Sequence, residues 1–374
     1  MDFTIVTAWY DVREKENHPM KDKTTNDFFP TTHEYFDKNK QKFLTKPFPM
    51  VIYTEPRFEQ MIKEHRPAHL HPFTRFIFKD YEELPFYNLF NKYEENHHKN
   101  PVQNLDATKF TPLYKFIVNQ KTNFVKEVAE MNPFNTTHFA WMDLRLHCVY
   151  NMSPEETVDT FATIEPNKVR MMFMSYLAPG DIWGRHDFYS WTRGKIAAGF
   201  FGGRAKPIIE FARLCQKEFV DAINEGMAPS DEMIYSFVTA NNTHLFEPYV
   251  GEYGDCLRNM QMARCSGHLF MPFFYSSFDH QNWYYTVALF DNISQGFLNN
   301  QIHLSNEDIY NVWYRGFISN LNMNRPEKSR TILQKLIELY KNNRDIPFQN
   351  GKEQFREKSG ELGYNELVEA IDSL

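Results

Sequence analysis

Residues Lys115–Arg145 read KFIVNQKTNFVKEVAEMNPFNTTHFAWMDLR. The apolar run 116–118 predicts a short buried strand, and the apolar spacing within 124–131 predicts a helix. A second apolar run, 138–142, predicts another strand, which ends at one carboxylate, Asp143. A strand, a helix and a strand in this order are typical of an open α/β sheet, which binds ligands at the carboxyl ends of its strands. We therefore expect Asp143 at a ligand-binding edge.

Strands and helices also alternate through most of the chain before residue 240. The predicted strands are Phe3–Tyr10, Pro49–Thr54, Phe73–Phe78, Val169–Leu177 and Ile196–Gly203. The predicted helices are Thr31–Leu44, Pro56–His65 and Lys206–Gly226, with a further helix beginning near Asp231. This pattern favours an α/β sheet with parallel strands. No GxGxxG or GxxxxGK[ST] motif follows a strand, so neither a dinucleotide-binding Rossmann site nor a P-loop is expected.

The last part of the chain has a different character. Ser305 followed three residues later by an acid has the pattern of a capping box. Helices are predicted at about 305–321, 326–343 and 349–373. We expect two domains: an α/β domain over residues 1–285 and a helical extension packed on it over residues 286–374.

Charge and composition exclude several classes of protein. The 374-residue chain has a formal net charge of −7, which argues against a nucleic-acid-binding protein, because phosphate binding needs clustered Lys and Arg. Its four cysteines are scattered and form no CxxC pair, so a zinc site is not expected and a reducing compartment is the simpler interpretation. Neither a secretory signal nor a run of 18 apolar residues is present. We expect no integral membrane segment and a cytoplasmic location.

Three pairs of residues each have a structural and a functional interpretation. Paired glycines at 202–203 follow an apolar strand, where they allow backbone to approach a ligand closely or simply make a turn. Asp231 and Glu232 open a helix, where acids favour the helix dipole; the functional alternative is a general base for an acceptor hydroxyl. His97 and His98 are predicted to lie in a polar loop, and a surface position is the favoured interpretation over a metal site.

Several segments together resemble a known family. In chain order they are FTIVTAWYDV, VIYTE, FIVNQKTNFVKEVAEMNPFNTTHFAWMDLR, FFGG, SDEMIY and LFEPYVGEYGD. This order is similar to that of the HtrL/YibB-type glycosyltransferase-like proteins over roughly residues 3–285. The most specific parts are the Asn-x-Lys turn at 119–121, the Asn-Pro-Phe turn at 132–134 and the F-x-W-x-D ending at 139–143. The resemblance implies a GT-A fold: a Rossmann-like mixed sheet flanked by helices, which binds a sugar nucleotide at its carboxyl edge.

The resemblance also implies roles for individual residues. Asp143 would hold a divalent metal, Mn²⁺ or Mg²⁺, on the donor diphosphate, with a late histidine, His268 or His280, as a further ligand. Leu144-Arg145 stands where the wider fold often has a second acid, so Arg145 would share the charge neutralisation. Asp231 or Glu232 would deprotonate the acceptor hydroxyl. The donor would be bound by Thr7, Ala8, Tyr10, Arg13, Tyr53, Thr54, Lys121, Trp141, Asp143, Arg145, Gly202 and Gly203.

The expected function is therefore glycosyl transfer. The donor would be a UDP- or GDP-sugar, the acceptor a hydroxyl of a glycan or another molecule, and the reaction metal-assisted and inverting. The alternative is a catalytically inactive GT-A-like protein that binds a nucleotide or glycan, and the missing second acid after Asp143 favours it. A nucleotidyltransferase would need a loop rich in Gly and Lys or Arg after the first strand, and Trp9–Arg13 lacks the glycines.

Overall fold

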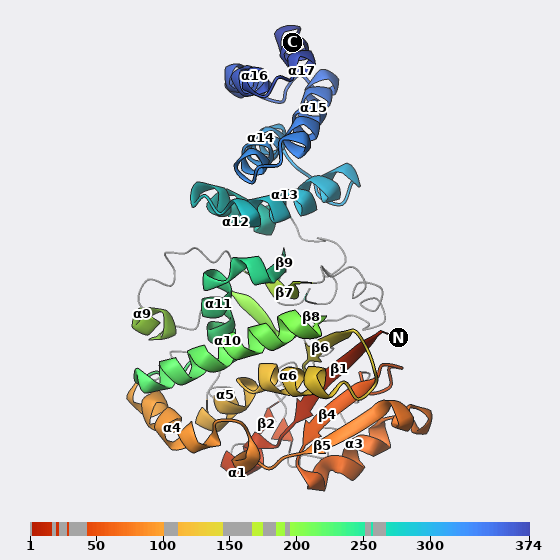
Figure 1. The fold of residues 1–374 in the computed structure, drawn as a ribbon, viewed down its shortest axis with the longest axis vertical. Helices are drawn as coiled ribbons and strands as arrows, with labels where there is room; N and C mark the ends of the chain where they lie inside the picture. Colours follow the sequence, from red (N-terminus) through yellow and green to blue (C-terminus); the bar gives the residue numbers. More distant parts are fainter. Residues whose placement is uncertain are drawn as a thin grey trace. The chain divides into compact units, whose positions relative to one another are not determined.

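The computed structural model describes residues 2–16, 20–21, 28–29, 43–100, 111–144, 167–174, 185–190, 195–250, 256 and 267–374. The chain divides into two compact units. Unit 1 comprises Met1–Glu247 with Tyr253–Gln261, and unit 2 comprises Pro248–Glu252 with Met262–Leu374. Unit 1 contains the sheet apart from the last three residues of strand β9 (Phe246–Val250), and the described part of unit 2 is otherwise built mainly from helices (Figure 1). We describe each unit by itself.

Unit 1 is organised around a seven-stranded mixed sheet in the order β5-β4-β1-β6-β8-β7-β9. The strands are β1 (Phe3–Trp9), β4 (Met50–Thr54), β5 (Thr74–Phe78), β6 (His138–Met142), β7 (Val169–Phe173), β8 (Ile196–Arg204) and β9 (Phe246–Val250). β1 pairs in parallel with both β4 and β6, and β5 pairs in parallel with β4. β8 is antiparallel to β6 and β7. A separate antiparallel pair joins β2 (Met20–Lys21) and β3 (Phe28–Phe29).

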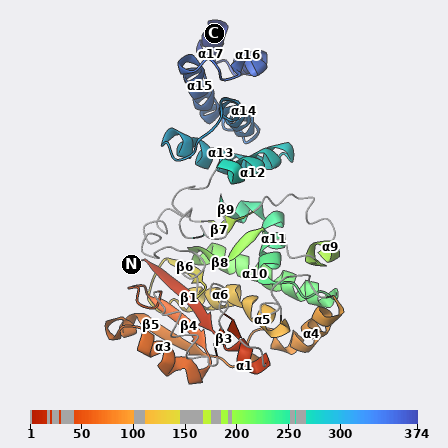
Figure 2. The same ribbon diagram turned by 180° about the vertical axis from the view of Figure 1, so that it is seen from behind.

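The central strands are buried along nearly their whole length, as expected when both faces of a sheet are covered. β4, β6 and β7 are buried at every position, and β1 at all but one. β5 lies at an edge of the sheet, and its side chains are half-buried or exposed. The strands predicted from the sequence near residues 3, 50, 74, 169 and 196 are confirmed. Figure 2, seen from behind, shows β1 and β4 side by side, as their pairing requires.

The order of the strands reverses between β1 and β6. From β1 the chain moves outward to β4 and then β5, whereas β6 pairs with the other side of β1. In open α/β sheets such a reversal leaves a crevice outside the carboxyl ends of the two central strands, and ligands bind there. Asp143 follows β6 directly and therefore lies at this edge, as predicted from the sequence.

Helices cover the sheet. They are α1 (Val12–Glu16), α3 (Glu59–His65), α4 (Phe90–Lys99), α5 (Pro112–Val118), α6 (Lys121–Met131), α9 (Arg185–Ser190), α10 (Ala205–Asn224) and α11 (Asp231–Asn241). Short 3₁₀ helices lie at Pro56–Phe58, Ala68–Phe73, Tyr81–Glu83, Tyr87–Leu89 and Thr243–Leu245. α6 and α10 pack side by side (Figure 1). The predicted helices at 56–65, 206–226 and 231 onward are confirmed, whereas most of the one at 31–44 lies outside the described residues.

Two local predictions were wrong. The apolar run 116–118 is the end of helix α5 and not a strand. Thr111 caps this helix by accepting a hydrogen bond from the backbone N–H of Tyr114 (3.2 Å), and Pro112 occupies its first turn. The opening segment is therefore helix, helix and strand. His97 and His98 lie at the end of helix α4 and not in a loop.

Unit 2 contains the helices α12 (Gly267–Asp279), α13 (Trp283–Leu298), α14 (Asn306–Asn322), α15 (Pro326–Asn342), α16 (Lys352–Glu361) and α17 (Asn365–Asp372). α13 packs on α12 and α14, α14 on α15, and α16 on α17. The Ser305 hydroxyl caps α14 by accepting a hydrogen bond from the backbone N–H of Asp308 (3.1 Å). Gly316 lets α14 approach α13 closely, because a Cβ there would lie 2.3 Å from the Phe290 ring. The predicted helical C-terminal region is confirmed.

Candidate functional site

Lys121 is the centre of a buried cluster in unit 1. Its ammonium lies 3.0 Å from Asp143 Oδ1 and 2.8 Å from Asp231 Oδ2. It also donates a hydrogen bond to the backbone carbonyl of Ala198 (3.3 Å). An ammonium has three N–H donors, so these three partners use them all. We call Lys121, Asp143 and Asp231 the Lys121 cluster; the structure thus brings together three residues that the sequence singled out separately.

A short turn places Lys121 at the first position of α6. The Asn119 amide donates hydrogen bonds to Lys115 O (2.8 Å) and to Pro229 O (3.0 Å). The first bond closes the end of α5, and the second ties this turn to the segment that leads into α11. The amino ends of α6 and α11 are thereby held together, which is why Asp231, the first residue of α11, meets Lys121.

Asp143 is oriented from two sides. Trp141 Nε1–H donates to Asp143 Oδ1 (2.6 Å), and the Asp143 backbone N–H donates to the carbonyl of Gly199 on β8 (2.9 Å). Its side chain is 39% exposed, compared with 8% for each of Lys121 and Asp231. Asp143 is therefore the carboxylate of the cluster that an incoming ligand can reach directly.

Opposing effects set the protonation of the cluster. Burial favours a neutral Lys121, but the carboxylates of Asp143 and Asp231 outweigh it and raise the pKa of Lys121 above its ordinary value. Burial also raises the pKa of Asp231, against the opposing effect of the Lys121 ammonium, and the neighbouring Asp143 carboxylate adds to the rise. One ammonium between two carboxylates leaves the cluster with a net negative charge, which favours a cation at its exposed side.

Four aromatic side chains pack against one another beside the Lys121 cluster. Phe124 on α6 stacks on Tyr53 of β4, with ring centroids 4.2 Å apart, and lies near Trp141 (6.2 Å) and Tyr10 (6.4 Å). The Lys121 ammonium lies 5.8 Å from the Trp141 ring. Three predicted donor-binding residues thus share one aromatic neighbour. Phe124 itself was missed, although it follows Lys121 by three residues and so lies on the same side of α6.

The other predicted donor residues near β1 are partly structural. Thr7 is fully buried within β1, and Ala8 pairs with Tyr53 of β4. The Thr54 hydroxyl donates to the backbone carbonyl of Trp9 (2.8 Å), so it closes the β1–β4 edge. The side chain of Arg13, and all of Arg145, lie outside the described residues.

Two buried phenols, Tyr10 and Tyr81, lie at the same edge of the sheet. A role was predicted from the sequence for Tyr10 but not for Tyr81. The hydroxyls of Tyr10 and Tyr81 are buried and have no hydrogen-bond partner among the described residues. Their ring centroids are 5.5 Å apart, and burial raises both pKa values. The fully buried Asp11 accepts a hydrogen bond from the backbone N–H of Glu14 (3.2 Å). Tyr81 lies in a short 3₁₀ turn, and nothing in its sequence context relates it to β1.

Gly202 and Gly203 are not brought to Asp143. The register of β8 pairs Gly202 with Ala140 and Gly203 with Phe139. The β8 residue beside Asp143 is instead Gly199, because the two strands run antiparallel. Gly203 has a packing role, since a Cβ there would lie 2.7 Å from the carbonyl of Lys168. A role of these glycines in donor binding stays a prediction.

Of the two candidate bases, the structure brings Asp231 into the cluster. The backbone N–H of Glu232 donates to the Asp231 carboxylate. The Glu232 carbonyl accepts a hydrogen bond from the Ser236 hydroxyl (2.7 Å), as expected within α11. The Glu232 side chain is half-buried.

Within the described part of the chain, the Lys121 cluster offers a divalent cation one exposed carboxylate. Among the described residues, no group of three or more His, Cys, Asp or Glu side chains could hold a metal ion. Of the two carboxylates in the Lys121 cluster, that of Asp143 is the exposed one, and Mg²⁺ is commonly bound through one or two carboxylates with phosphate and water oxygens. The donor set and the net charge of the cluster therefore fit an ion that a diphosphate brings with it.

The predicted histidine ligands do not belong to unit 1. His280 lies in unit 2, is exposed, and has Nδ1 2.8 Å from the carbonyl of Ser276. The side chain of His268 lies outside the described residues. A shared metal site with Asp143 stays a prediction.

The fold and the cluster define an α/β protein with a polar site at the carboxyl edge of a mixed sheet. The family model HtrL_YibB, described as a bacterial protein of unknown function, matches residues 1–262. The chain belongs to this family, as its sequence motifs predicted. No curated protein matches the chain. In the part of the chain that the structure describes, no helix is long and apolar enough to span a membrane.

Proposed function

We propose that unit 1 is a GT-A-type glycosyltransferase domain that moves a sugar from a nucleotide-diphosphate donor to a hydroxyl of a glycan or other acceptor. The observation that carries the proposal is the position of the Lys121 cluster directly after β6, at the edge where the strand order reverses. This is where open α/β sheets bind nucleotides. UDP- and GDP-sugars are the donor classes we would test.

The donor would occupy the exposed side of Asp143. The side chains of Tyr10, Tyr53 and Trp141 pack around Phe124, and all four are buried, so in this proposal they support the sheet edge beneath the donor. Lys121 has no free N–H for a phosphate, since Asp143, Asp231 and Ala198 use all three. In this proposal Lys121 positions the two carboxylates and does not contact the donor.

The reaction would be a displacement at the anomeric carbon. The acceptor oxygen bonds to that carbon, the bond from the carbon to the diphosphate breaks, and the hydroxyl proton passes to a carboxylate. Asp231 is the better supported base, because its raised pKa makes it a stronger proton acceptor than an ordinary carboxylate; Glu232 is the second candidate. A bound divalent ion, with Asp143 as its protein ligand, would neutralise charge on the leaving diphosphate.

The same cluster supports a second candidate, a protein that binds a nucleotide or glycan without transfer. Asp231 is 8% exposed and already paired with Lys121, so an acceptor has limited access to it. In this alternative the cluster has a structural role only: its ion pairs hold the end of β6 and the starts of α6 and α11 together.

One screen tests the proposal. The full chain is incubated with a panel of sugar nucleotides, with Mn²⁺, with Mg²⁺ or with a chelator, and the released nucleoside diphosphate is measured. Release from one donor class supports the transferase. Saturable binding of a nucleoside diphosphate without release from any donor, in the presence of glycan acceptors, supports the second candidate.

A further inference from the structure

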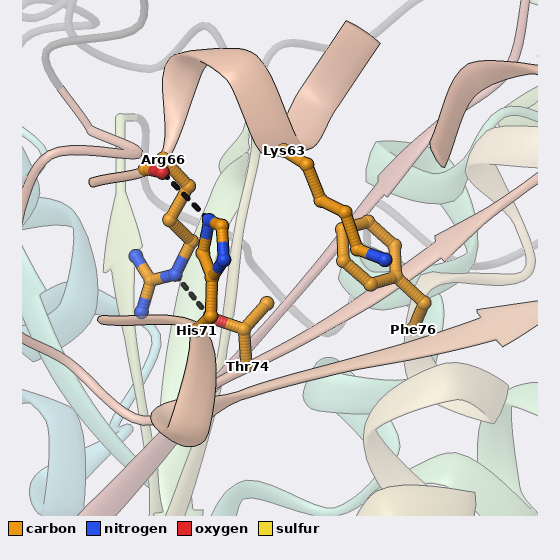
Figure 3. Close-up of a pocket in the computed structure, with 5 residues that line it drawn as sticks. All are labelled: Lys63, Arg66, His71, Thr74 and Phe76. Atoms are coloured by element: carbon orange, nitrogen blue, oxygen red, sulfur yellow. Dashed lines mark hydrogen bonds between the residues drawn. The ribbon is translucent and has the colours of Figure 1, made fainter. Parts of the chain in front are cut away.

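A cavity of about 290 Å³ lies at the other end of the sheet and is lined by Lys63, Arg66, His71, Thr74 and Phe76 (Figure 3). Thr74 begins β5, which runs parallel to β4 and β1. The cavity therefore lies at the amino-terminal edge of the sheet, opposite to the carboxyl edge that carries Asp143. Three of its five lining residues are basic types and none is acidic.

Arg66 is a buried cation with no acidic partner among the described residues. It is 2% exposed, and its Nη1 donates to Leu44 O (2.8 Å) and Lys46 O (3.2 Å), while Nη2 donates to Phe48 O (2.7 Å). Its Nε–H donates to the Thr74 hydroxyl. A guanidinium has five N–H donors, so one on Nη2 remains. Burial alone lowers the pKa of Arg66 to about 10.

A buried charge without a counter-ion is costly, because the backbone carbonyls around it supply only partial charges. Arg66 nevertheless holds the segment before β4 to the start of β5 through these carbonyls and Thr74. An anion in the adjoining cavity would supply the missing countercharge.

The mouth of the cavity suits such an anion. The Lys63 ammonium lies over the Phe76 ring, 5.6 Å from its centroid (Figure 3). It also pairs with Glu59 (2.5 Å) on the same helix. The exposed His71 is held by a contact of 2.9 Å between its Nε2 and the carbonyl of Arg66. Lys63 and His71 thus bring two polar nitrogen-bearing side chains to the rim, beside one aromatic face.

We propose that this cavity binds a small phosphate-bearing ligand, independently of the carboxyl-edge site. Guanidinium and ammonium groups both recognise phosphate oxygens, and Phe76 offers an apolar surface to a short carbon portion. The volume is at the lower end of small-molecule sites, which fits a phosphomonoester better than a whole sugar nucleotide.

The test uses inorganic phosphate as the probe, with the full chain, by calorimetric titration at constant ionic strength. We expect saturable binding that weakens roughly tenfold in Lys63→Gln and again in Lys63→Gln/His71→Gln, as the loss of charge-assisted contacts predicts. Arg75→Gln is the matched control. It also removes one positive charge, from β5 between Thr74 and Phe76 but on the opposite face of the strand, and should leave the affinity unchanged.

Two results would overturn the proposal. One is the absence of saturable binding tighter than about 1 mM, which would mean an adventitious ion only. The other is an equal loss of affinity in Arg75→Gln, which would indicate general surface charge. Asp143→Asn separates the two sites: phosphate affinity should not change in this variant, and a loss there would place the phosphate at the carboxyl edge. The result does not depend on whether the protein transfers sugars.

Discussion

Asp143 is the exposed carboxylate of the Lys121 cluster, so a ligand at the carboxyl edge meets it first. Asp143→Asn keeps the size of the side chain and its hydrogen bond from Trp141 but removes the charge. If unit 1 hydrolyses or transfers from a sugar nucleotide, we expect the rate to fall roughly 100-fold or more, because the lost charge acts on the leaving diphosphate. Released nucleotide is the measurement. Asp221→Asn, another partly exposed acid, is the control and should keep full activity.

We expect different effects on transfer from substitutions of the two candidate bases, Asp231 and Glu232. Asp231→Asn should abolish transfer and preserve binding of the nucleoside diphosphate, because it leaves the Asp143 side of the cluster in place. Glu232→Gln should retain transfer, since the hydrogen bond from Glu232 to Asp231 comes from its backbone N–H, which the substitution keeps. Transfer and binding are measured separately for each variant. The reverse outcome would assign the base to Glu232, and full activity in both variants would place it elsewhere.

Lys121 stabilises the fold as well as the site. Lys121→Met leaves Asp231 buried beside Asp143 without its ammonium, and removing one partner of a buried pair typically costs about 3–5 kcal/mol of unfolding free energy. Denaturant unfolding measures this loss. Asp231→Asn on the Lys121→Met background should recover part of it, because the buried charge is then absent. No recovery would mean that packing, and not charge, explains the loss.

The loss of unfolding free energy in Lys121→Met should be small at acid pH and should grow toward neutral pH. Burial raises the pKa of Asp231 in the folded protein above its value in the unfolded chain, and the variant lacks the ammonium that opposes this rise. A group with a raised folded pKa contributes stability at low pH and loses it as the pH rises through the folded pKa. The variant should therefore approach wild-type stability in acid and differ most at neutral pH. A constant difference across this range would contradict the burial argument.

The close packing of Gly203 on β8 can be tested by substitution. In Gly203→Ala the new methyl group would lie 2.7 Å from the carbonyl of Lys168, and backbone cannot give way cheaply. We expect a loss of about 1–3 kcal/mol in unfolding free energy, with donor affinity unchanged. Gly360→Ala on α16, where a methyl group meets nothing, is the control and should not destabilise. A normal fold with lost donor affinity would instead support the ligand-binding role predicted from the sequence.

Helices and strands with a distinctive period were predictable. β1, β4, β6 and α10 have long apolar runs or a clear helical stripe, and the structure confirms them. The error at α5 has a simple cause: a three-residue apolar run fits a buried strand and a buried helix equally well. The Thr111-Pro112 pair was the available signal, because Thr caps helices and Pro favours their first turn.

The candidate site was predictable only in parts. Asp143 and Lys121 were found because both lie at element ends within one motif. Their meeting with Asp231 depends on how α11 packs against the turn before α6, more than 100 residues away. The place of Gly202 depends on the register of an antiparallel pair, and the sequence alone did not specify even the direction of β8. Contacts of this kind are set by tertiary packing.

The two compact units allow ligand binding to be located. A nucleoside diphosphate at 100 times its dissociation constant should stabilise the folded state of its binding unit by about 2.7 kcal/mol. If it binds at the carboxyl edge, hydrogen exchange should slow around the end of β6 and the start of α11. Exchange in α14 and α15 of unit 2 provides the internal reference. Slowing confined to unit 2 would contradict the proposed donor site.

The burial of Lys121 has a practical consequence for covalent labelling. An amine reacts with acylating reagents only in its neutral form, and the Lys121 ammonium is both shielded and held protonated by two carboxylates. It should react far more slowly than exposed lysines such as Lys99 or Lys217. Mass spectrometry of a labelled sample would then use this one side chain as a native reporter, and a change in its reactivity would reveal any opening of the cluster without an attached probe.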